Sequence, residues 1–148
     1  MQYMPLDLKI AVFSMFAQVL LTFYAVIKVG VTRITAVRQH GIRLSDVAFD
    51  ASGYPEFARR HGNNLANQFE FPILLYVGVM LAVLFDASSM LFAIFCLGFV
   101  ISRYYHRLVH VRSNRVVLRF QVFVAGIIML FFAWVVLGFN LLMAEFAG

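Results

Sequence analysis

Charged residues are scarce in this chain, and their scarcity excludes a water-soluble domain. Only 13% of the 148 residues are Asp, Glu, Lys or Arg, whereas 63% are hydrophobic. Soluble globular domains are about 25% charged and roughly 45–50% apolar. So much apolar surface with so few charges to hydrate it predicts an integral membrane protein.

Cysteine is nearly absent as well. The one cysteine, Cys96, excludes an internal disulfide and a metal cluster held by thiolates of a single chain. Gly-rich phosphate loops, Ser/His/Asp arrangements and the inverted repeats of transporters are also missing. Although the net charge is +5, no basic block alternates with aromatic residues on a soluble segment. Nucleic acid is therefore excluded as a partner.

The apolar residues gather in segments that predict four transmembrane helices. Their expected bounds are about 8–38, 56–85, 88–111 and 115–146. The apolar part of the first, Ile10–Val31, exceeds the roughly 20 residues that cross a bilayer. Gly, Ser, Asp and Pro in 39–56 indicate a loop, and Pro72 is expected to bend the second helix. The sequence thus predicts an all-α, four-helix membrane bundle that forms one domain over the whole chain.

The cationic residues are distributed unevenly along these segments. Ten of the twelve flank the first or the third connection: Arg33, Arg38, Arg43, Arg59, Arg60, Arg103, Arg107, Arg112, Arg115 and Arg119. Loops rich in Lys and Arg stay in the cytoplasm. Both Arg-rich loops are therefore expected in the cytoplasm. Both termini are expected on the non-cytoplasmic side of a bacterial inner (plasma) membrane.

A polar stripe leads into the second apolar segment. At about 100° per residue, five side chains fall within about 120° of one another: Arg60, Asn63, Asn64, Asn67 and Glu70. Such a stripe is costly in lipid and must face other helices, water or a ligand. We interpret it as one wall of a polar pocket at the membrane boundary.

The third segment carries a matching polar face. Four of its side chains share one side of the predicted helix: Arg103, His106, Arg107 and His110. Counting about 20 residues from the turn at 86–87 puts both polar faces at one depth near the cytoplasmic boundary. Glu70 then has two possible roles, a structural ion pair with Arg103 or Arg107 and a direct contact with a ligand.

The histidines and arginines leave further alternatives open. His106 and His110 are spaced i, i+4, which suits a metal ion or the edge of a haem, but His61 is the only further histidine available to join them. A polar network between helices is the other role. The arginines suit either lipid headgroups or a small polyanion with two carboxylates, such as glutathione.

Over nearly its whole length the chain resembles the MAPEG family (membrane-associated proteins in eicosanoid and glutathione metabolism). Helix 2 of that family carries Arg-x3-Asn-x2-Glu shortly before a proline. Arg60, Asn64 and Asn67 take that place here, followed by Pro72. Asn67 thus replaces the glutamate of the family, and Glu70 supplies a carboxylate one turn later.

The third and fourth segments are similar to the prostaglandin E synthase branch, which has Arg, His, Tyr and two further Arg in that order. The matching residues are Arg103, His106, His110, Arg115 and Arg119. His110 stands where that branch has a tyrosine. The family also has an arginine that ends helix 1 and reaches the ligand, and Arg33 fits that position.

The resemblance implies a homotrimer with glutathione as cosubstrate, bound between subunits and facing the cytoplasm. It also implies transferase or peroxidase activity on a lipophilic small molecule that enters from the bilayer. Arg119 would activate the thiol, because a guanidinium beside sulfur stabilises the thiolate and lowers the thiol pKa. The expected binding residues are Lys28, Arg33, Arg60, Asn64, Asn67, Glu70, Arg103, His106, His110 and Arg115.

A second hypothesis keeps the fold without the chemistry. Asn67 and His110 depart from the family pattern, and a fold does not by itself imply a function. The chain is under this hypothesis a non-catalytic membrane subunit or a lipid-binding module of a larger membrane complex. Membrane lipids are partners under both hypotheses.

Overall fold

The computed structural model describes residues 3–113 and 115–146, and the regular structure in this part of the chain is helical. The three long helices are α1 (Leu6–His40), α4 (Met90–Val111) and α5 (Val116–Phe146). Each is long and apolar enough to cross a membrane. The predicted all-helical membrane architecture is therefore present.

The ends of the long helices follow local sequence signals. α1 begins after Pro5 and ends at Gly41, whose φ of 65° is a left-handed conformation that glycine adopts without strain. The hydroxyl of Ser89 accepts a hydrogen bond from the backbone N–H of Phe92 and so caps α4. The long helices thus begin and end at residues that supply caps or turns.

The loop between α1 and α2 contains two short 3-10 helices, η1 (Leu44–Val47) and η2 (Ala51–Gly53). The carboxylate of Asp50 accepts hydrogen bonds from the backbone N–H and the hydroxyl of Ser52, the former at 2.8 Å. These hydrogen bonds lower the pKa of Asp50. A charged carboxylate is thereby held at the start of η2.

The second predicted helix requires a correction. The sequence predicts one bent helix over 56–85, whereas the structure has two, α2 (Glu56–Ala66) and α3 (Pro72–Leu84). Pro72 has no N–H to donate, and its ring clashes with the carbonyl four residues earlier in a continuous helix. The helix is interrupted over 67–71 and starts again at the proline, a position that proline favours.

The break is a tight turn. The backbone N–H of Gln68 donates to the carbonyl of Leu65 at 2.9 Å, and that of Phe69 donates to the carbonyl of Ala66 at 3.0 Å. α3 has 13 residues, so it is about 20 Å long, shorter than the roughly 30 Å of bilayer hydrocarbon. α3 alone is therefore too short to cross the bilayer as the second of the four predicted helices was expected to do.

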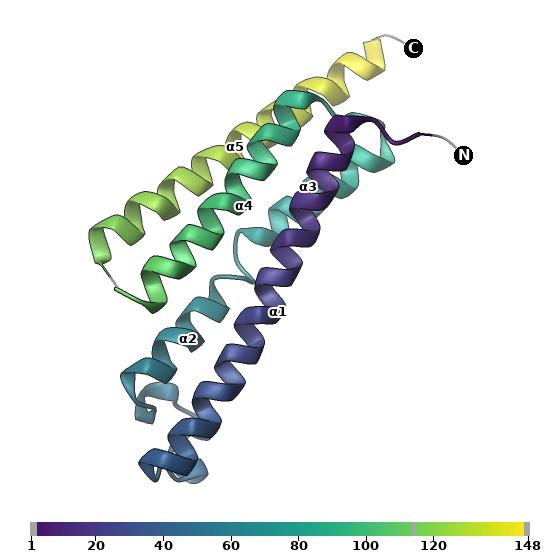
Figure 1. Ribbon diagram of the computed structural model, residues 1–148. Coiled ribbons are helices and arrows are strands. Elements are labelled where there is room, and N and C mark those ends of the chain that lie inside the picture. Colours follow the sequence, from purple (N-terminus) through teal and green to yellow (C-terminus); the bar gives the residue numbers. More distant parts are fainter. Residues whose placement is uncertain (1–2, 114, 147–148) are drawn as a thin grey trace.

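The helices pack as a bundle with two distinct ends (Figure 1). α4 and α5 run antiparallel side by side, α1 packs along α4, and α2 and α3 pack in succession along α1. The start of α1, the end of α5 and the turn from α3 to α4 lie at one end. The η1–η2 loop, the end of α4 and the start of α5 lie toward the other. The Arg-rich segments therefore gather at this second end.

The interior is apolar, and so is most of the exterior. Phe92, Phe99 and Leu137 are among the largest fully buried side chains. On the outside, Phe13 is 69% exposed and Leu84 is 74% exposed, with many similar residues along every long helix. Apolar surface on this scale faces lipid or another subunit rather than water. The chain is an integral membrane protein.

Close packing of α4 on α5 depends on Gly126. A Cβ at this position would lie 2.2 Å from Ser102 Oγ and 3.3 Å from Ser102 Cβ. The Ser102 hydroxyl donates to the carbonyl of Phe99 at 2.6 Å, so it cannot turn away without losing that bond.

We expect Gly126→Ala to destabilise the protein by about 1–3 kcal/mol, measured by thermal unfolding in detergent. Gly138→Ala is the control, because open space surrounds Gly138 on the same helix. Equal melting temperatures for the two variants would show that the close contact is not important.

Candidate functional site

The polar residues predicted on α2 and α4 meet in the structure. The Arg107 guanidinium donates to the side-chain carbonyl of Asn64, and Arg103 Nη2 donates to the backbone carbonyl of Asn67 at 2.6 Å. Asn64 and Arg103 are 0% and 2% exposed. Asn67 lies just past the end of α2, where carbonyls lack partners within the helix. Arg103 therefore replaces a hydrogen bond that the break removes.

Arg107 also connects α4 with α1. Its guanidinium carbon lies 4.6 Å from the centre of the Tyr24 ring, within the range of a cation–π interaction. The amino group of Lys28 lies 5.6 Å from the centre of the same ring. The Tyr24 ring thus lies close to two cationic side chains, Arg107 of α4 and Lys28 of α1.

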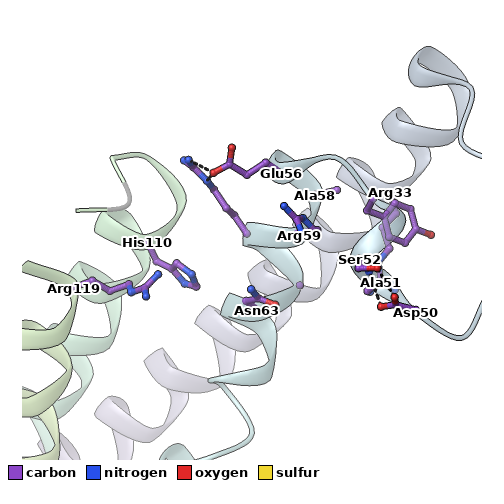
Figure 2. Close-up of a pocket in the computed structure, with 13 residues that line it drawn as sticks. Arg33, Asp50, Ala51, Ser52, Glu56, Ala58, Arg59, Asn63, His110 and Arg119 are labelled. Carbon is purple, nitrogen blue, oxygen red and sulfur yellow. Dashed lines mark hydrogen bonds and ion pairs between the residues drawn. The ribbon is translucent and has the colours of Figure 1, made fainter. Parts of the chain in front are cut away.

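A cavity of about 620 Å³ lies between the end of α1, the η2 turn, α2 and the facing ends of α4 and α5 (Figure 2). Four arginines line it: Arg33, Arg59, Arg60 and Arg119. Asp50, Glu56, Asn63 and His110 add two carboxylates, an amide and an imidazole. Figure 2 shows Arg119 and His110 on one side of this space and Arg33 and Asp50 on the other.

Two of these arginines are held in place by neighbours. Arg60 Nη2 lies 2.6 Å from Glu56 Oε1, and its Nη1 donates to the carbonyl of Arg112 at 3.4 Å. The hydrogen bond and the positive charge of Arg60 lower the pKa of Glu56. The guanidinium carbon of Arg33 lies 5.2 Å from the centre of the Tyr54 ring. Since an exposed ion pair adds little stability, the main effect of these contacts is to orient the two guanidinium groups.

A second cavity of about 490 Å³ adjoins the first, because Asn63, His110 and Arg119 line both. Its other polar lining residues include Glu70 and His106. Phe120 and Phe123 supply apolar walls from α5. The first cavity is therefore lined mainly by polar side chains, whereas the second is lined by both polar and apolar side chains.

An apolar groove continues from the second cavity into the bundle. Glu70, Phe71 and Leu74 line a shallow pocket next to it. Phe71 and Leu74 also line a groove of about 310 Å³ between α3 and α5. In that groove the indole N–H of Trp134 donates to the carbonyl of Leu74 at 3.2 Å, which fixes the ring. Polar cavity and apolar groove thus lie in sequence along one side of the molecule.

Glu70 does not form the predicted ion pair with Arg103 or Arg107 within the described residues. It is exposed and lines the second cavity. The break at 67–71 takes Glu70 off the face of α2, and the two arginines bind Asn67 and Asn64 instead. The carboxylate is therefore directed toward the cavity rather than into the contact between helices.

Three histidines near the cavities have a buried Nδ1 atom without a hydrogen-bond partner in the described part of the chain. His106 and His110 are 4% and 5% exposed, and their ring centres lie 5.7 Å apart. Nδ1 of both, and of His61 on α2, has no partner among the described residues. Burial, with the nearby positive charges of Arg107 and Lys28, lowers the pKa of His61. Within residues 3–113 and 115–146 no group of three or more His, Cys, Asp or Glu could hold a metal ion, so the metal interpretation gains no support.

The predicted binding residues fall into three groups. Those that line one or both cavities are Arg33, Arg60, Asn67, Glu70, His106, His110 and Arg119. Asn64 and Arg103 are buried in the contact between α2 and α4. Lys28 and Arg115 line neither cavity.

A buried pair of amides was not predicted. Gln18 Nε2 on α1 donates to Gln68 Oε1 at 2.9 Å, and Gln68 Nε2 donates to the carbonyl of Asn64 at 3.2 Å. Both glutamines are at most 1% exposed. The sequence signal for this pair is Gln18 itself, an amide inside the apolar run of the first helix, because an amide in such a run needs a polar partner.

Long apolar helices around an arginine-lined cavity at one end define a membrane helical bundle with a polar site. The sequence model of the MAPEG family matches residues 11–139, and the chain belongs to that family. This confirms the resemblance inferred from the polar residues of the second and third segments. No curated relative and no solved structure matches the chain. The family includes glutathione transferases and other membrane proteins, so membership alone does not specify the activity.

The Gln18–Gln68 pair is expected to anchor the break to α1. Gln18→Leu or Gln68→Leu alone leaves a buried amide without its partner, and each is expected to cost about 1–3 kcal/mol. The double variant removes both polar groups, so it should be more stable than the sum of the single effects predicts. Thermal unfolding of the four proteins in one detergent measures this coupling. Strict additivity would show that the two amides do not interact.

Proposed function

We propose that this protein is a membrane-bound, glutathione-dependent transferase or peroxidase that acts on a lipophilic electrophile. The observation that carries the proposal is the arginine-lined cavity, which adjoins a second cavity that leads toward an apolar groove. Glutathione has two carboxylates, and guanidinium groups bind carboxylates through paired hydrogen bonds. The apolar groove suits the lipophilic partner, which reaches it from the bilayer.

In the proposed mechanism Arg119 activates the thiol. It lines both cavities, so a sulfur beside it also lies near the apolar side of the site. The positive guanidinium stabilises the thiolate and lowers the thiol pKa, which raises the fraction of the reactive form. Of the three other cavity arginines, Arg33 and Arg60 bind the carboxylates, and Asn67, Glu70 and His106 complete the polar wall.

The proposal includes a membrane arrangement and an assembly. α3 together with residues 67–71 forms the fourth crossing, and α2 lies at the cytoplasmic surface. The Arg-rich end faces the cytoplasm and both termini lie on the other side of a bacterial inner membrane, as the distribution of cations favours. Three copies form a homotrimer, in which the exposed apolar faces of the helices pack on neighbouring subunits as well as on lipid.

A non-catalytic membrane subunit or a lipid-binding module is the second candidate. It is favoured by the use that the structure makes of Asn64 and Arg103, two of the expected ligand residues. Both are buried and occupied in joining α2 to α4. A polar site that serves mainly to hold helices together needs no cosubstrate.

Substitution of Arg119 tests the catalytic proposal. Removing one group that stabilises a developing anion commonly lowers turnover by about 10²–10³-fold, and we expect Arg119→Ala to do so with glutathione and a lipophilic model electrophile. Arg115→Ala is the matched control, because Arg115 is exposed one turn earlier and lines neither cavity. Turnover is measured on the detergent-purified protein.

Isothermal titration of the same proteins with glutathione separates the two candidates. Heat of binding in the wild type and in Arg115→Ala supports the glutathione proposal. No heat up to millimolar glutathione, from a protein whose helical content and melting temperature are intact, would favour the non-catalytic subunit.

The orientation is tested by cysteine labelling in intact cells with a membrane-impermeant thiol reagent. Met4→Cys, before α1, is expected to react from outside, and Ser45→Cys, in η1, only after the cells are lysed. The native Cys96 is buried and gives the background. If Ser45→Cys is labelled in intact cells and Met4→Cys is not, the topology is the reverse of the proposed one.

A further inference from the structure

His110 stands where the two cavities meet. It lines both, together with Asn63 of α2 and Arg119 of α5. Figure 2 shows its imidazole extending from α4 into the space opposite Asn63, with the guanidinium of Arg119 beside it. His110 is only 5% exposed, and its Nδ1 has no partner among the described residues. A buried polar group without a partner is uncommon and calls for a functional explanation.

We infer that His110 is the group that accepts the proton from the cosubstrate thiol. The inference rests on the proposed function and assigns a step that Arg119 cannot perform. A guanidinium stabilises a thiolate, but it is always protonated and has no acceptor site. Of the three residues that line both cavities, Asn63 has an amide that does not titrate, so only the imidazole can take a proton.

The tyrosine of the prostaglandin E synthase branch would not do the same. A phenol has a pKa of about 10 and holds its proton at neutral pH, whereas an imidazole exchanges protons there. His110 therefore changes the chemistry available at this position rather than merely its shape. The replacement of this tyrosine by His110 therefore adds a base at this position.

Several titratable or charged groups surround His110. Arg60 and His61 face it from α2, His106 and Arg107 from α4, and Arg119 from α5. The arginines among them attract the two carboxylates of glutathione, so the cosubstrate is drawn to the space that contains the proposed acceptor.

The step balances for addition to an activated carbon–carbon double bond. The S–H bond breaks, the proton binds the imidazole, and the thiolate remains beside Arg119. The sulfur electron pair then forms the S–C bond, and the electron pair of the double bond moves toward the conjugated carbonyl to give an enolate. The imidazolium returns its proton to the enolate, so the product is the thioether and no leaving group or oxidant is needed.

The test compares His110→Gln with the wild type and with His40→Gln. His40 is the control, because it receives the same substitution but is exposed at the end of α1 and lines neither cavity. Isothermal titration measures glutathione binding. The ultraviolet absorbance of bound thiolate, followed against pH, measures ionisation of the thiol. Turnover is measured with a long-chain α,β-unsaturated ketone.

We expect His110→Gln to bind glutathione within about threefold of the wild type. The thiolate absorbance should appear only at higher pH. Turnover should fall by roughly 10²-fold, the usual contribution of a general base. His40→Gln should keep the pH profile of the wild type. His110→Tyr is a second variant that fills the site, and it should show the same displaced profile as His110→Gln.

Three results would overturn the inference in distinguishable ways. If the wild type fails to bind glutathione, the proposed function fails and the role of His110 fails with it. If His110→Gln and His110→Tyr both bind glutathione and keep the wild-type thiolate profile, His110 is not the acceptor, while the proposed function stands. If the thiolate absorbance is shifted to higher pH in Glu70→Gln but not in the His110 variants, the proton acceptor is Glu70 and not His110.

Discussion

A helix that stops inside an apolar surrounding leaves carbonyl groups that must find partners, and the rest of this structure depends on how that need is met. Pro72 cannot continue the helix that precedes it. At the break, the carbonyl of Asn67 accepts a hydrogen bond from Arg103. In lipid an unsatisfied backbone carbonyl costs several kcal/mol. One arginine on α4 therefore permits α2 and α3 to be separate helices.

The neighbouring contacts extend this connection across three helices. Arg107 binds Asn64 and lies over Tyr24 of α1, and Gln68 binds Gln18 of α1. These contacts hold α2 and the break against α1 and α4, and the cavities lie where α2 faces the start of α5. The polar residues of this region thus divide into those that join helices and those that face an open space.

That division has a chemical consequence. Arg103 and Arg107 are buried, donate hydrogen bonds to groups of the protein itself and line neither cavity. Arg33, Arg59, Arg60 and Arg119 line the first cavity. An anion in this space meets guanidinium groups from α1, α2 and α5 and an imidazole from α4. A site assembled from several helices also explains why a single sequence motif describes it poorly.

The helices were largely predictable, and the site was predictable in part. Long apolar runs require helices in a membrane, so the bounds of α1, α4 and α5 agree with the sequence to within two residues. The break at 67–71 was missed, because a proline either bends or ends a helix depending on what satisfies the freed carbonyls. Helical periodicity correctly paired the faces of α2 and α4. It could not place Asp50 or Tyr54, since a loop has no period.

The sequence by itself determined that this is a helical membrane protein of the MAPEG family, with its cations gathered at one end. Composition and helical periodicity indicate the membrane helices, because lipid imposes the same demands on every residue of a span, and the match of residues 11–139 to the family's sequence model gives the family. Only the tertiary structure decided which polar groups are bound to each other and which face the cavity. Asn64 and Asn63 are adjacent in the sequence, yet one is buried against Arg107 and the other lines both cavities. The polar stripe at 60–70 could not reveal this difference, because it arises from where α4 and α5 lie against α2.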